Sequence, residues 1–419
     1  MSKFRIMQKK ILLSLMVLFT GLVFLFSCTK QSGNELEGLM SITVTPEDTA
    51  VALGQDIQFR AFGLFADNTV REITADVEWG SSPAGKVSVN GSGYAAAIDT
   101  GATYVTAGAA GVISGAVTLV ATPAQLGKIM VIWDYETNYL ASAVSNPGWT
   151  GDVTTCKAGI NSAETHKRVL QRINYFRRMV GLPDDVSLDS LKNLKCQEAA
   201  LMMQANNELS HSPPNPWSCW TQNGADAAAS SNLALGMNAT AAITGYMQDV
   251  GATNVDAGHR RWILFSKAKV MGEGSTSNAH ALWVFGNGGN PVPAGLQYIA
   301  YPPKGYVPAP LVFARWSLGV PDGDFTTANV TMLDKNAAPV NVTVVARSTG
   351  YGDNSIVWEP SGVVTTGPDD AKYTVNVTGV LVGGSPKTYS YDVIIMQVSK
   401  KKSGEGSFEE DRHVQAEVR

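Results

Sequence analysis

Apolar and polar positions divide the chain into regions of different character. Residues 11–27 form one apolar run behind a start that is rich in lysine and arginine, as in a signal segment for export. From residue 40 to 124, short stretches alternate between apolar and polar positions, which is typical of strands that bury one face. Turn residues separate these stretches, so we expect residues 40–124 to form an all-β sandwich.

The next region, residues 125–292, has the period of amphipathic helices. Apolar residues recur every three or four positions over residues 162–183, which predicts a helix with one buried face. Asn161 and Glu164 fit a capping box at its start. Further elements are expected over residues 187–211 and 239–250, as helices, and over residues 281–289, as a strand and a turn. Helices followed by short strands predict an α+β unit.

Alternating apolar and polar stretches return over residues 293–399. They predict a second all-β, sandwich-like domain at the C-terminal end. Residues 400–419 are charged and poor in apolar side chains, so we expect a disordered tail. The chain is therefore predicted to be multidomain, with an α+β unit between two β units.

Composition agrees with several folded domains and argues against one class of partner. The chain has 419 residues, of which 44% are hydrophobic and 16% are charged, so it can bury substantial cores. Its formal net charge is -4. Proteins that bind nucleic acid usually carry a basic patch or stripe. We therefore expect no nucleic acid among its partners.

Cys28 follows the apolar run directly. The stretch Leu-Phe-Ser-Cys at residues 25–28 resembles the lipobox of bacterial lipoproteins. The resemblance implies that residues 1–27 are a signal peptide and that Cys28 carries an acyl lipid such as palmitate, with residues 28–39 as a tether to the membrane. Thr29, in place of an aspartate, favours the outer membrane or the cell surface. An uncleaved N-terminal anchor is the alternative.

Three cysteines remain if Cys28 is lipidated, namely Cys156, Cys196 and Cys219. An odd number cannot pair completely within one chain. Cys196 and Cys219 flank a predicted helix end and the loop after it, which favours that pair, and a bond from Cys156 to either one is the alternative. No C-x-x-C spacing occurs, so we expect no zinc site made of cysteines.

A set of short motifs runs through residues 40–124. A V-x-P strand opens the region, and a G-Q segment, an A-x-G segment, an I-T pair and a V-x-W-x-S segment follow it. The motif residues are Gly54, Gln55, Ala61, Gly63, Ile73, Thr74, Val77, Trp79 and Ser81. The set resembles the group 2 bacterial immunoglobulin-like domain, which implies a spacer or an adhesion module without enzymatic activity. We expect Trp79 to lie in its core.

Two histidines of the middle region lie in ordered motifs. His211 follows the second predicted helix in the stretch NELSHS, and His259 begins the stretch HRRWIL, with SNLALG between them. Together with INYFRRMVGLP before them and VMGEG after them, these motifs resemble the CAP superfamily of cysteine-rich secretory, antigen 5 and pathogenesis-related proteins. The resemblance implies an α-β-α sandwich over residues 125–292.

The resemblance also implies a cleft in which two histidines and two acids can hold zinc or another divalent metal. His211 and His259 match the family histidines, and Asp249 stands at the place of one acid. Ser231 replaces the other acid, beside Asn232, so both residues are expected to line the cleft. Serine is a poor zinc ligand, and the metal site is therefore expected to be incomplete.

Two classes of function follow from this cleft. The first is a binding module, held at the cell envelope, that presents the cleft to a lipid, a glycan, or an envelope or host protein. The alternative is a metal-assisted hydrolase or peptidase in which His211, His259 and Asp249 hold the ion that activates water. No recognisable motif supplies a serine or cysteine nucleophile. We favour binding without catalysis, because an incomplete ligand set does not easily fix a metal.

The other polar residues near these motifs also have structural interpretations. His259 on its own could be a buried polar residue with satisfied hydrogen bonds. Arg260 and Arg261 could pair with Asp249 and Asp256. Of the remaining histidines, His166 is expected on the exposed side of the first helix, and His280 at the surface or in packing.

Cys28→Ser is expected to release the protein from membranes or to block its maturation, since the lipid-bearing side chain is removed. Membrane fractionation and the size of the precursor on a gel measure this. Unchanged membrane association together with an unchanged precursor size would show that the lipobox interpretation is wrong.

Overall fold

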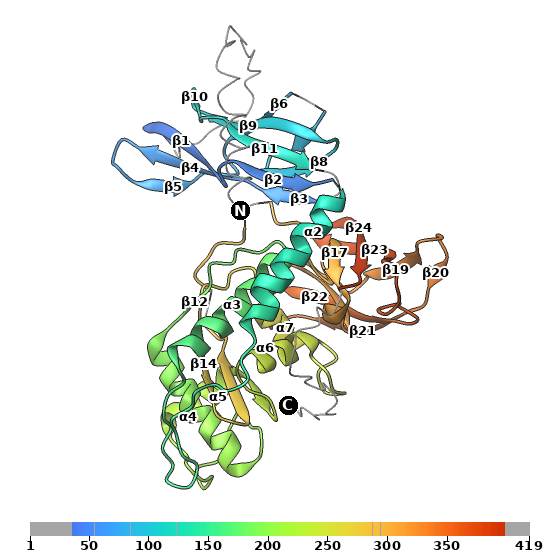
Figure 1. Ribbon diagram of the computed structural model, residues 1–419. Helices are drawn as coiled ribbons and strands as arrows, with labels where there is room; N and C mark the ends of the chain where they lie inside the picture. Colours follow the sequence, from blue (N-terminus) through green and yellow to red (C-terminus); the bar gives the residue numbers. More distant parts are fainter. Residues whose placement is uncertain are drawn as a thin grey trace, which may run out of the picture.

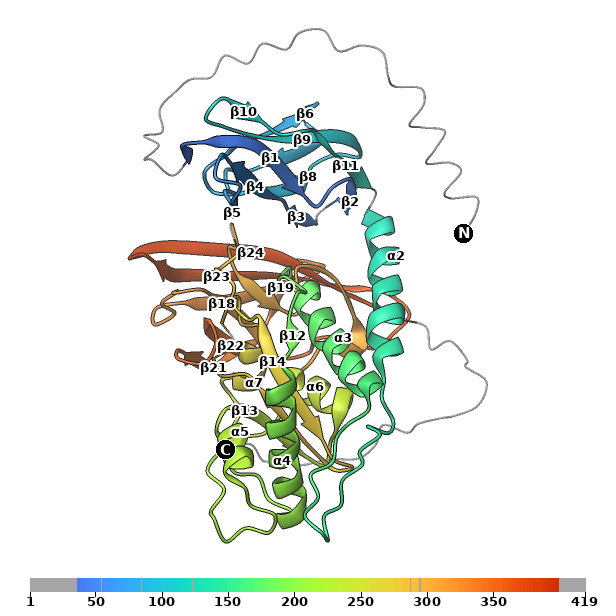
Figure 2. The ribbon, with the colours of Figure 1, turned by 90° about the vertical axis from the view of Figure 1, so that its left-hand side faces the viewer.

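A computed structural model describes residues 36–398, except for residues 54, 84, 123, 287 and 294. The apolar run, Cys28 and the final charged residues lie outside the described residues, as does Gly54. Within the described range, no helix combines the length and apolar character that a membrane span requires. The described chain forms a β part, a middle part of helices and strands, and a second β part (Figures 1 and 2).

The first β part is built from short strands in three sheets. The first sheet has the order β1 (Leu39–Thr45), β4 (Arg60–Phe65) and β5 (Val70–Glu72). The second has the order β10 (Val112–Ile113), β9 (Gly101–Ala109), β11 (Val117–Thr122) and β2 (Thr49–Ala52), and β6 (Glu78–Ser82) also pairs with β9. The third has the order β3 (Asp56–Gln58), β8 (Tyr94–Ala97) and β7 (Val87–Val89). Phe59, Phe65 and Leu119 fill the core between them, and Trp79 packs at its edge, partly buried. The expected β-rich first domain is therefore present, and Trp79 belongs to the edge of its core.

One helix connects this part to the rest of the chain and was not expected from the sequence. Helix α2 (Ala124–Asp134) runs from the first β part along the middle part (Figure 2). Two further helical turns, Tyr135–Tyr139 and Leu140–Ser142, extend it. Lys128 on α2 forms an ion pair of 2.7 Å with Asp370 of the second β part. Helix α2 thus contacts all three parts of the molecule.

The middle part consists of three layers. Its helices are α3 (Ala163–Met179), α4 (Ser190–Asn206), α5 (Gln222–Ala229), α6 (Ala239–Gln248) and α7 (Gly258–Ile263), and its sheet order is β12 (Ser187–Leu188), β14 (Val270–Ser275), β15 (Ala279–Trp283) and β13 (Ser231–Leu235). Ala281 packs with α4 and α5, whereas its neighbour Leu282 belongs to the core formed with α3 and α6. Successive strand residues point to opposite faces, so the sheet lies between two helical layers, as the family resemblance implied.

Two glycines on β14 let helix α4 approach the sheet closely. A Cβ atom at Gly272 would lie 2.3 Å from the side chain of Lys192, and one at Gly274 would lie 2.3 Å from the backbone nitrogen of Gln197. The residue between them, Glu273, points to the opposite face and is fully buried there. Strand β14 therefore presents two glycines without side chains toward α4 and the carboxylate of Glu273 toward α3.

Both helix boundaries near the predicted cleft differ from the expected ones. Ser162, and not Asn161, caps α3 by accepting a hydrogen bond of 3.1 Å from the backbone N–H of Thr165, while the Asn161 amide bonds to the backbone of β14. Helix α4 ends at Asn206 instead of near Ser210, because Asn207 takes a left-handed conformation with φ of 50°. His211 therefore lies in the following loop, and not at the helix end.

The second β part has two sheets that share a core with the middle part. The orders are β16 (Ile299–Tyr301), β18 (Trp316–Val320), β22 (Asn354–Pro360) and β21 (Val342–Ser348); and β17 (Gly305–Pro308), β24 (Ser385–Met396), β23 (Ala371–Val382), β19 (Asn329–Asp334) and β20 (Pro339–Val340). Trp316 and Trp358 are buried in the same continuous core as Phe176 of α3 and Tyr246 of α6. The second β part is thus fused to the middle part by one hydrophobic core.

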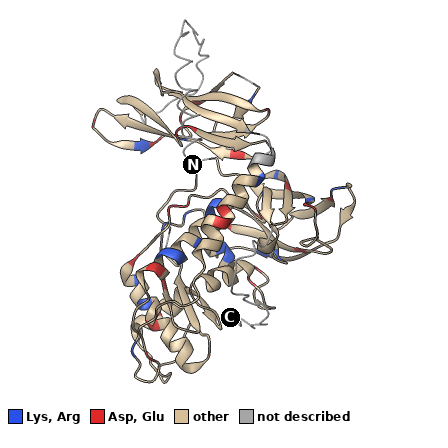
Figure 3. Cartoon of the chain, in the orientation of Figure 1, with Lys and Arg blue, Asp and Glu red and all other residues tan. Residues whose placement is uncertain are grey.

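Charged side chains are distributed unevenly over these parts. Several strands of the two β parts carry no charge, whereas helix α3 carries several basic side chains and, in its first turn, the acid Glu164 (Figure 3). On α3, Arg168 pairs with Glu164 at 2.6 Å, and at the helix end Arg178 pairs with Asp184 at 2.6 Å and with Asp134 at 2.8 Å. Arg168 and Arg178 are therefore paired with acids, whereas Arg172 and Arg177 donate to hydroxyl and carbonyl oxygens.

The favoured disulfide was wrong. Cys156 and Cys219 are bonded, which is one of the alternatives, and Cys196 is a free thiol. Cys196 is buried on the face of α4 that packs against the sheet. Cys156 and Cys219 lie instead in two loops outside the core. Burial raises the pKa of the Cys196 thiol to about 12.

Cys156→Ser/Cys219→Ser is expected to lower the free energy of unfolding by about 4 kcal/mol, because the bond closes a long loop and restricts the unfolded chain. The two cysteines are 63 residues apart. Urea titration measures the change, and Cys196→Ala, which touches no disulfide, is the control. Mass spectrometry that finds a Cys196–Cys219 peptide in the native protein would contradict this pairing.

Candidate functional site

His211 and His259 line the same cavity, which has a volume of about 400 Å³. His211 comes from the loop after α4, and His259 from the first turn of α7. Ser231 and Asn232 at the start of β13 also line this cavity. We call this cavity the histidine cleft. The structure thus brings together four of the residues that the sequence motifs singled out.

A backbone carbonyl holds the ring of His211. Its Nδ1 atom lies 2.8 Å from the carbonyl oxygen of Ala228 at the end of α5. A carbonyl oxygen can only accept, so Nδ1 donates, and in the neutral ring Nε2 keeps its lone pair. The ring is half-buried. His211 can therefore offer an acceptor to a ligand in the cleft.

A buried carboxylate forms a hydrogen bond with the ring of His259. The Nδ1 atom of His259 lies 2.6 Å from Oδ1 of Asp249, and the second oxygen of Asp249 accepts the backbone N–H of Arg260 at 3.2 Å. Asp249 is 1% exposed and does not line the histidine cleft. The ring of Tyr246 stacks on His259, with the ring centres 5.5 Å apart. Asp249 therefore orients His259, as a carboxylate often does behind a functional histidine.

Ser231 and Asn232 are less free than the motif suggests. The amide of Asn232 donates a hydrogen bond of 3.2 Å to the carbonyl oxygen of His259, and this ties β13 to α7. The hydroxyl of Ser231 lies 3.8 Å from the Cys196 sulfur. Asn232 is thus a positioning residue for the start of α7 as well as a residue of the cleft wall.

The donor set does not fit a metal with a complete shell. In the described part of the chain, no three histidine, cysteine or acidic side chains lie close enough together to hold an ion. Asp249 uses both carboxylate oxygens inside the protein. Asp256, which was expected only as a partner for an arginine, does line the cleft, and it lies 3.9 Å from Arg261.

Three aromatic side chains surround the mouth of the cleft and were not predicted. Trp262 of α7 lies 4.9 Å from Phe285 and 6.3 Å from Tyr351, measured between ring centres. Phe285 is 41% exposed and Tyr351 is 48% exposed. Tyr351 belongs to the turn between β21 and β22 of the second β part. Nothing in the sequence indicated that this turn reaches the cleft.

Buried arginines hold this turn and α7 in place. Arg261 donates two hydrogen bonds of 3.2 Å to the carbonyl oxygen of Asp353. The Asp353 carboxylate accepts from the backbone N–H of Ser266 at 2.7 Å and from its hydroxyl at 2.8 Å. A Cβ atom at Gly352 would lie 2.4 Å from the carbonyl oxygen of Arg261. The close approach of this glycine lets the second β part form one wall of the cleft.

Behind the cleft, a buried acid links two further histidines. Glu273 on β14 hydrogen-bonds to Nδ1 of His166 on α3 and lies 3.5 Å from Nε2 of His280 on β15. His280 in turn contacts the hydroxyl of Tyr246 at 3.0 Å. His166 was expected to be exposed, but its side chain is only 27% exposed because it covers Glu273. His280 is fully buried, so of its two expected positions, at the surface or in packing, the structure shows the second.

This network holds its central acid in the ionised form. Burial alone would raise the pKa of Glu273, but the hydrogen bonds and charges of His166 and His280 outweigh burial and lower it to about 2. The hydrogen bond to Glu273 raises the pKa of His166 in spite of its partial burial. Protonated His166 and Glu273 thus form a hydrogen-bonded ion pair that connects α3 to the sheet beneath Tyr246.

Comparison with known proteins agrees with the family resemblance that the sequence motifs of this region indicate. Residues 170–285 match the model of the cysteine-rich secretory protein family, CAP. The middle part of the chain is similar to the CAP family. The matched residues include His211, Asn232, Asp249 and His259, so the CAP-like region contains the whole predicted site.

The chain is also similar, at low identity or over a short stretch, to one curated protein and to solved structures. Ice-binding protein 1 of Shewanella frigidimarina is 32% identical over 124 residues, which cover 28% of this chain and 14% of that protein. The chain therefore spans only a small part of this curated relative. The copper resistance protein PcoC of Escherichia coli aligns with 15% identity over 23% of this chain and 95% of its own, with a TM-score of 0.19. Domains 5–6 of the S-layer protein SbsC align with 12% identity over 85% of this chain and 98% of their own, also at 0.19. Scores this low assign no fold.

His166→Gln is expected to remove a pH-dependent part of the stability. Because the folded pKa of His166 is raised, its contribution is fully present below the ordinary value of 6.5 and is lost as the pH rises through the folded value. The free energy of unfolding of the unmodified protein should therefore fall, relative to the variant, as the pH rises above 6.5. Urea titrations over this range measure the difference.

Lys167→Gln is the matched control for this experiment, since Lys167 is the next residue of α3 and its side chain is 70% exposed. It should leave the pH dependence unchanged. An identical pH dependence in the His166 variant and in the unmodified protein would mean that the ion pair with Glu273 makes no contribution.

Proposed function

We propose that the protein is an exported, lipid-anchored module that binds a ligand in the histidine cleft without catalysing a reaction. The observation that carries this proposal is the convergence of His211 and His259 in one open cavity, with three aromatic rings at its mouth. Pockets with aromatic walls and a few convergent polar groups are typical binding sites. The similarity to the CAP family supports a ligand-binding role.

The lining of the cleft indicates the chemistry of its ligand. Two imidazoles, the Asn232 amide and the Asp256 carboxylate provide hydrogen-bonding groups, and Trp262 provides an apolar face. A bare acyl chain would leave the polar groups without partners, which is unfavourable on burial. Of a lipid, a glycan and a protein segment, the cleft therefore favours a ligand with hydrogen-bonding groups beside a flat apolar face.

A metal-assisted hydrolase is the alternative, and the site supports it less well. An ion that activates water needs three protein ligands at an open position. The histidine cleft has two imidazoles, while the carboxylate of Asp249 is occupied by His259 and Arg260.

Anchoring completes the proposal. The N-terminal run and Cys28 would hold the mature protein at a membrane by an acyl chain, and each buried methylene contributes about 0.8 kcal/mol. The first β part would then separate the cleft from the membrane. An envelope or host molecule is the partner that this placement favours.

Metal content and ligand binding together distinguish the two functions. The unmodified protein and a His211→Ala/His259→Ala variant are both expected to carry little zinc after dialysis against a zinc buffer, as measured by plasma mass spectrometry. Stoichiometric zinc in the unmodified protein that is lost in the variant would favour the hydrolase.

The binding role is tested with the same protein in a thermal-shift screen of envelope glycans and peptides. A ligand of the cleft is expected to raise the Tm of the unmodified protein, and Trp262→Ala should weaken its binding about tenfold, which corresponds to about 1.4 kcal/mol. Trp133→Ala is the matched control, because this exposed tryptophan lies on α2 and does not line the cleft. Equal binding by the Trp262 and Trp133 variants would exclude the cleft as the site.

A further inference from the structure

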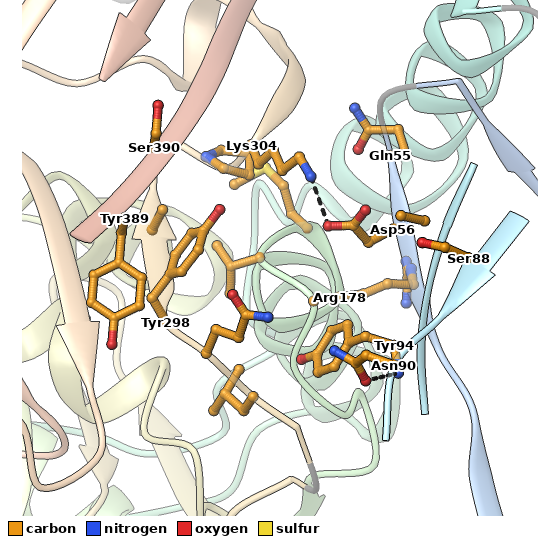
Figure 4. Close-up of a pocket in the computed structure, with 18 of the residues that line it drawn as sticks. Gln55, Asp56, Ser88, Asn90, Tyr94, Arg178, Tyr298, Lys304, Tyr389 and Ser390 are labelled. Carbon is orange, nitrogen blue, oxygen red and sulfur yellow. Dashed lines mark hydrogen bonds and ion pairs between the residues drawn. The ribbon is translucent and has the colours of Figure 1, made fainter. Parts of the chain in front are cut away.

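A second cavity lies where the three parts of the molecule meet. It has a volume of about 480 Å³ and is lined by strands of the first β part, by the end of α3 and by the second β part (Figure 4). None of its lining residues also lines the histidine cleft. We call it the interdomain crevice. Ligand sites occur preferentially at boundaries between domains, so its walls are of interest.

Tyrosines and amides form the two facing walls of this crevice. Gln55, Asn90 and Tyr94 come from the first β part, and Tyr298 and Tyr389 come from the second (Figure 4). Tyr298 stacks on Tyr391, with ring centres 5.4 Å apart, and meets Tyr389 at 5.3 Å. These rings are therefore fixed by one another before any ligand arrives, which lowers the entropy cost of binding.

The walls are held at a fixed separation. Lys304 of the second β part forms an ion pair of 2.6 Å with Asp56 at the start of β3. A Cβ atom at Gly305 would lie 1.6 Å from the side chain of Gln55, and one at Gly295 would lie 2.5 Å from that of Ser92. Only glycine allows the backbone of the second β part to approach this closely. The crevice is thus built into the contact between the two parts.

The cations of the crevice are already paired. Lys304 faces Asp56, and Arg178 at the end of α3 pairs with Asp134 and Asp184. An anionic ligand would have to displace these carboxylates. The lining therefore favours a ligand without net charge.

The polar groups that remain suit hydroxyl groups. Among the described residues, the hydroxyls of Tyr94, Tyr298 and Tyr389 have no hydrogen bond to another side chain or carbonyl in the protein, and Gln297 is exposed at the same place. Burial and the charge of Asp56 raise the pKa of Tyr94 to about 12, so its hydroxyl remains a donor at neutral pH. Side-chain amides and phenols each both donate and accept, as sugar hydroxyls do.

We propose that the interdomain crevice binds a neutral oligosaccharide. Sugar rings stack their apolar faces on the tyrosines, and their hydroxyls bond to the amides of Gln55 and Gln297. The amide oxygen of Asn90 already accepts from the backbone N–H groups of Ser92 and Tyr94, so Asn90 contributes its N–H groups as donors. The proposal does not depend on the proposed function of the histidine cleft, because the two sites share no residue.

The test measures binding of soluble oligosaccharides to the full chain. A short β-glucan, a mannan and a chitin oligosaccharide are titrated by calorimetry, and saturation-transfer NMR detects which sugar protons contact the protein. At least one of them is expected to bind with transfer to the ring C–H protons. Tyr389→Ala and Gln297→Ala are expected to weaken it about tenfold each, as loss of one stacked ring or one pair of hydrogen bonds predicts.

Two controls separate this site from the others. Tyr104→Ala changes an exposed tyrosine of the first β part outside the crevice and should leave binding unchanged, as should Trp262→Ala in the histidine cleft. Circular dichroism of each variant verifies its fold, and Gln297, which is exposed, is the substitution least able to disturb it. The proposal is overturned if no oligosaccharide binds, if the Tyr389 and Gln297 variants bind as well as the unmodified protein, or if Trp262→Ala alone abolishes binding.

Discussion

The histidine cleft depends most on the hydrogen bonds of one buried guanidinium, that of Arg260. Its guanidinium is fully buried and donates to the carbonyl oxygens of Met247 at 2.7 Å and Arg315 at 2.9 Å, while its planar group lies 4.5 Å from the ring centre of Tyr301. A buried charge is tolerated only when its donors have partners. Satisfying this one group requires α6, α7 and the second β part to sit together. His259, the residue before it, is placed as a consequence.

Both cavities are composite, and this explains why the three parts are joined so closely. The histidine cleft takes Tyr351 from the second β part, and the interdomain crevice takes Tyr298 and Tyr389 from it. The shared core makes these contributions rigid, because Trp316 and Phe176 belong to one continuous set of buried side chains. The second β part, which carried no recognisable motif, therefore supplies aromatic surface to each site.

Local sequence patterns predicted what depends on neighbours in the chain. The helices around Val169 and Met202, the β regions and the order of the two histidine motifs all follow from spacing and resemblance. Local sequence patterns did not predict the contacts between distant segments of the chain. The approach of Tyr351 to Trp262 spans two domains, and Glu273 between two glycines does not reveal that it faces His166 on another helix. The early end of α4 was missed because a left-handed Asn207 leaves little signal in sequence.

Burial of the Cys196 thiol bears on how the disulfide forms. With Cys28 set aside, Cys156, Cys196 and Cys219 allow three alternative pairings while the chain is unfolded. Once α4 docks on the sheet, Cys196 is shut away from oxidants and its thiolate is suppressed. Oxidation after α4 has docked therefore leaves Cys156 and Cys219 as the pair that can react, whereas oxidation of the unfolded chain also allows bonds to Cys196. The order of helix docking and disulfide formation thus decides how many pairings compete.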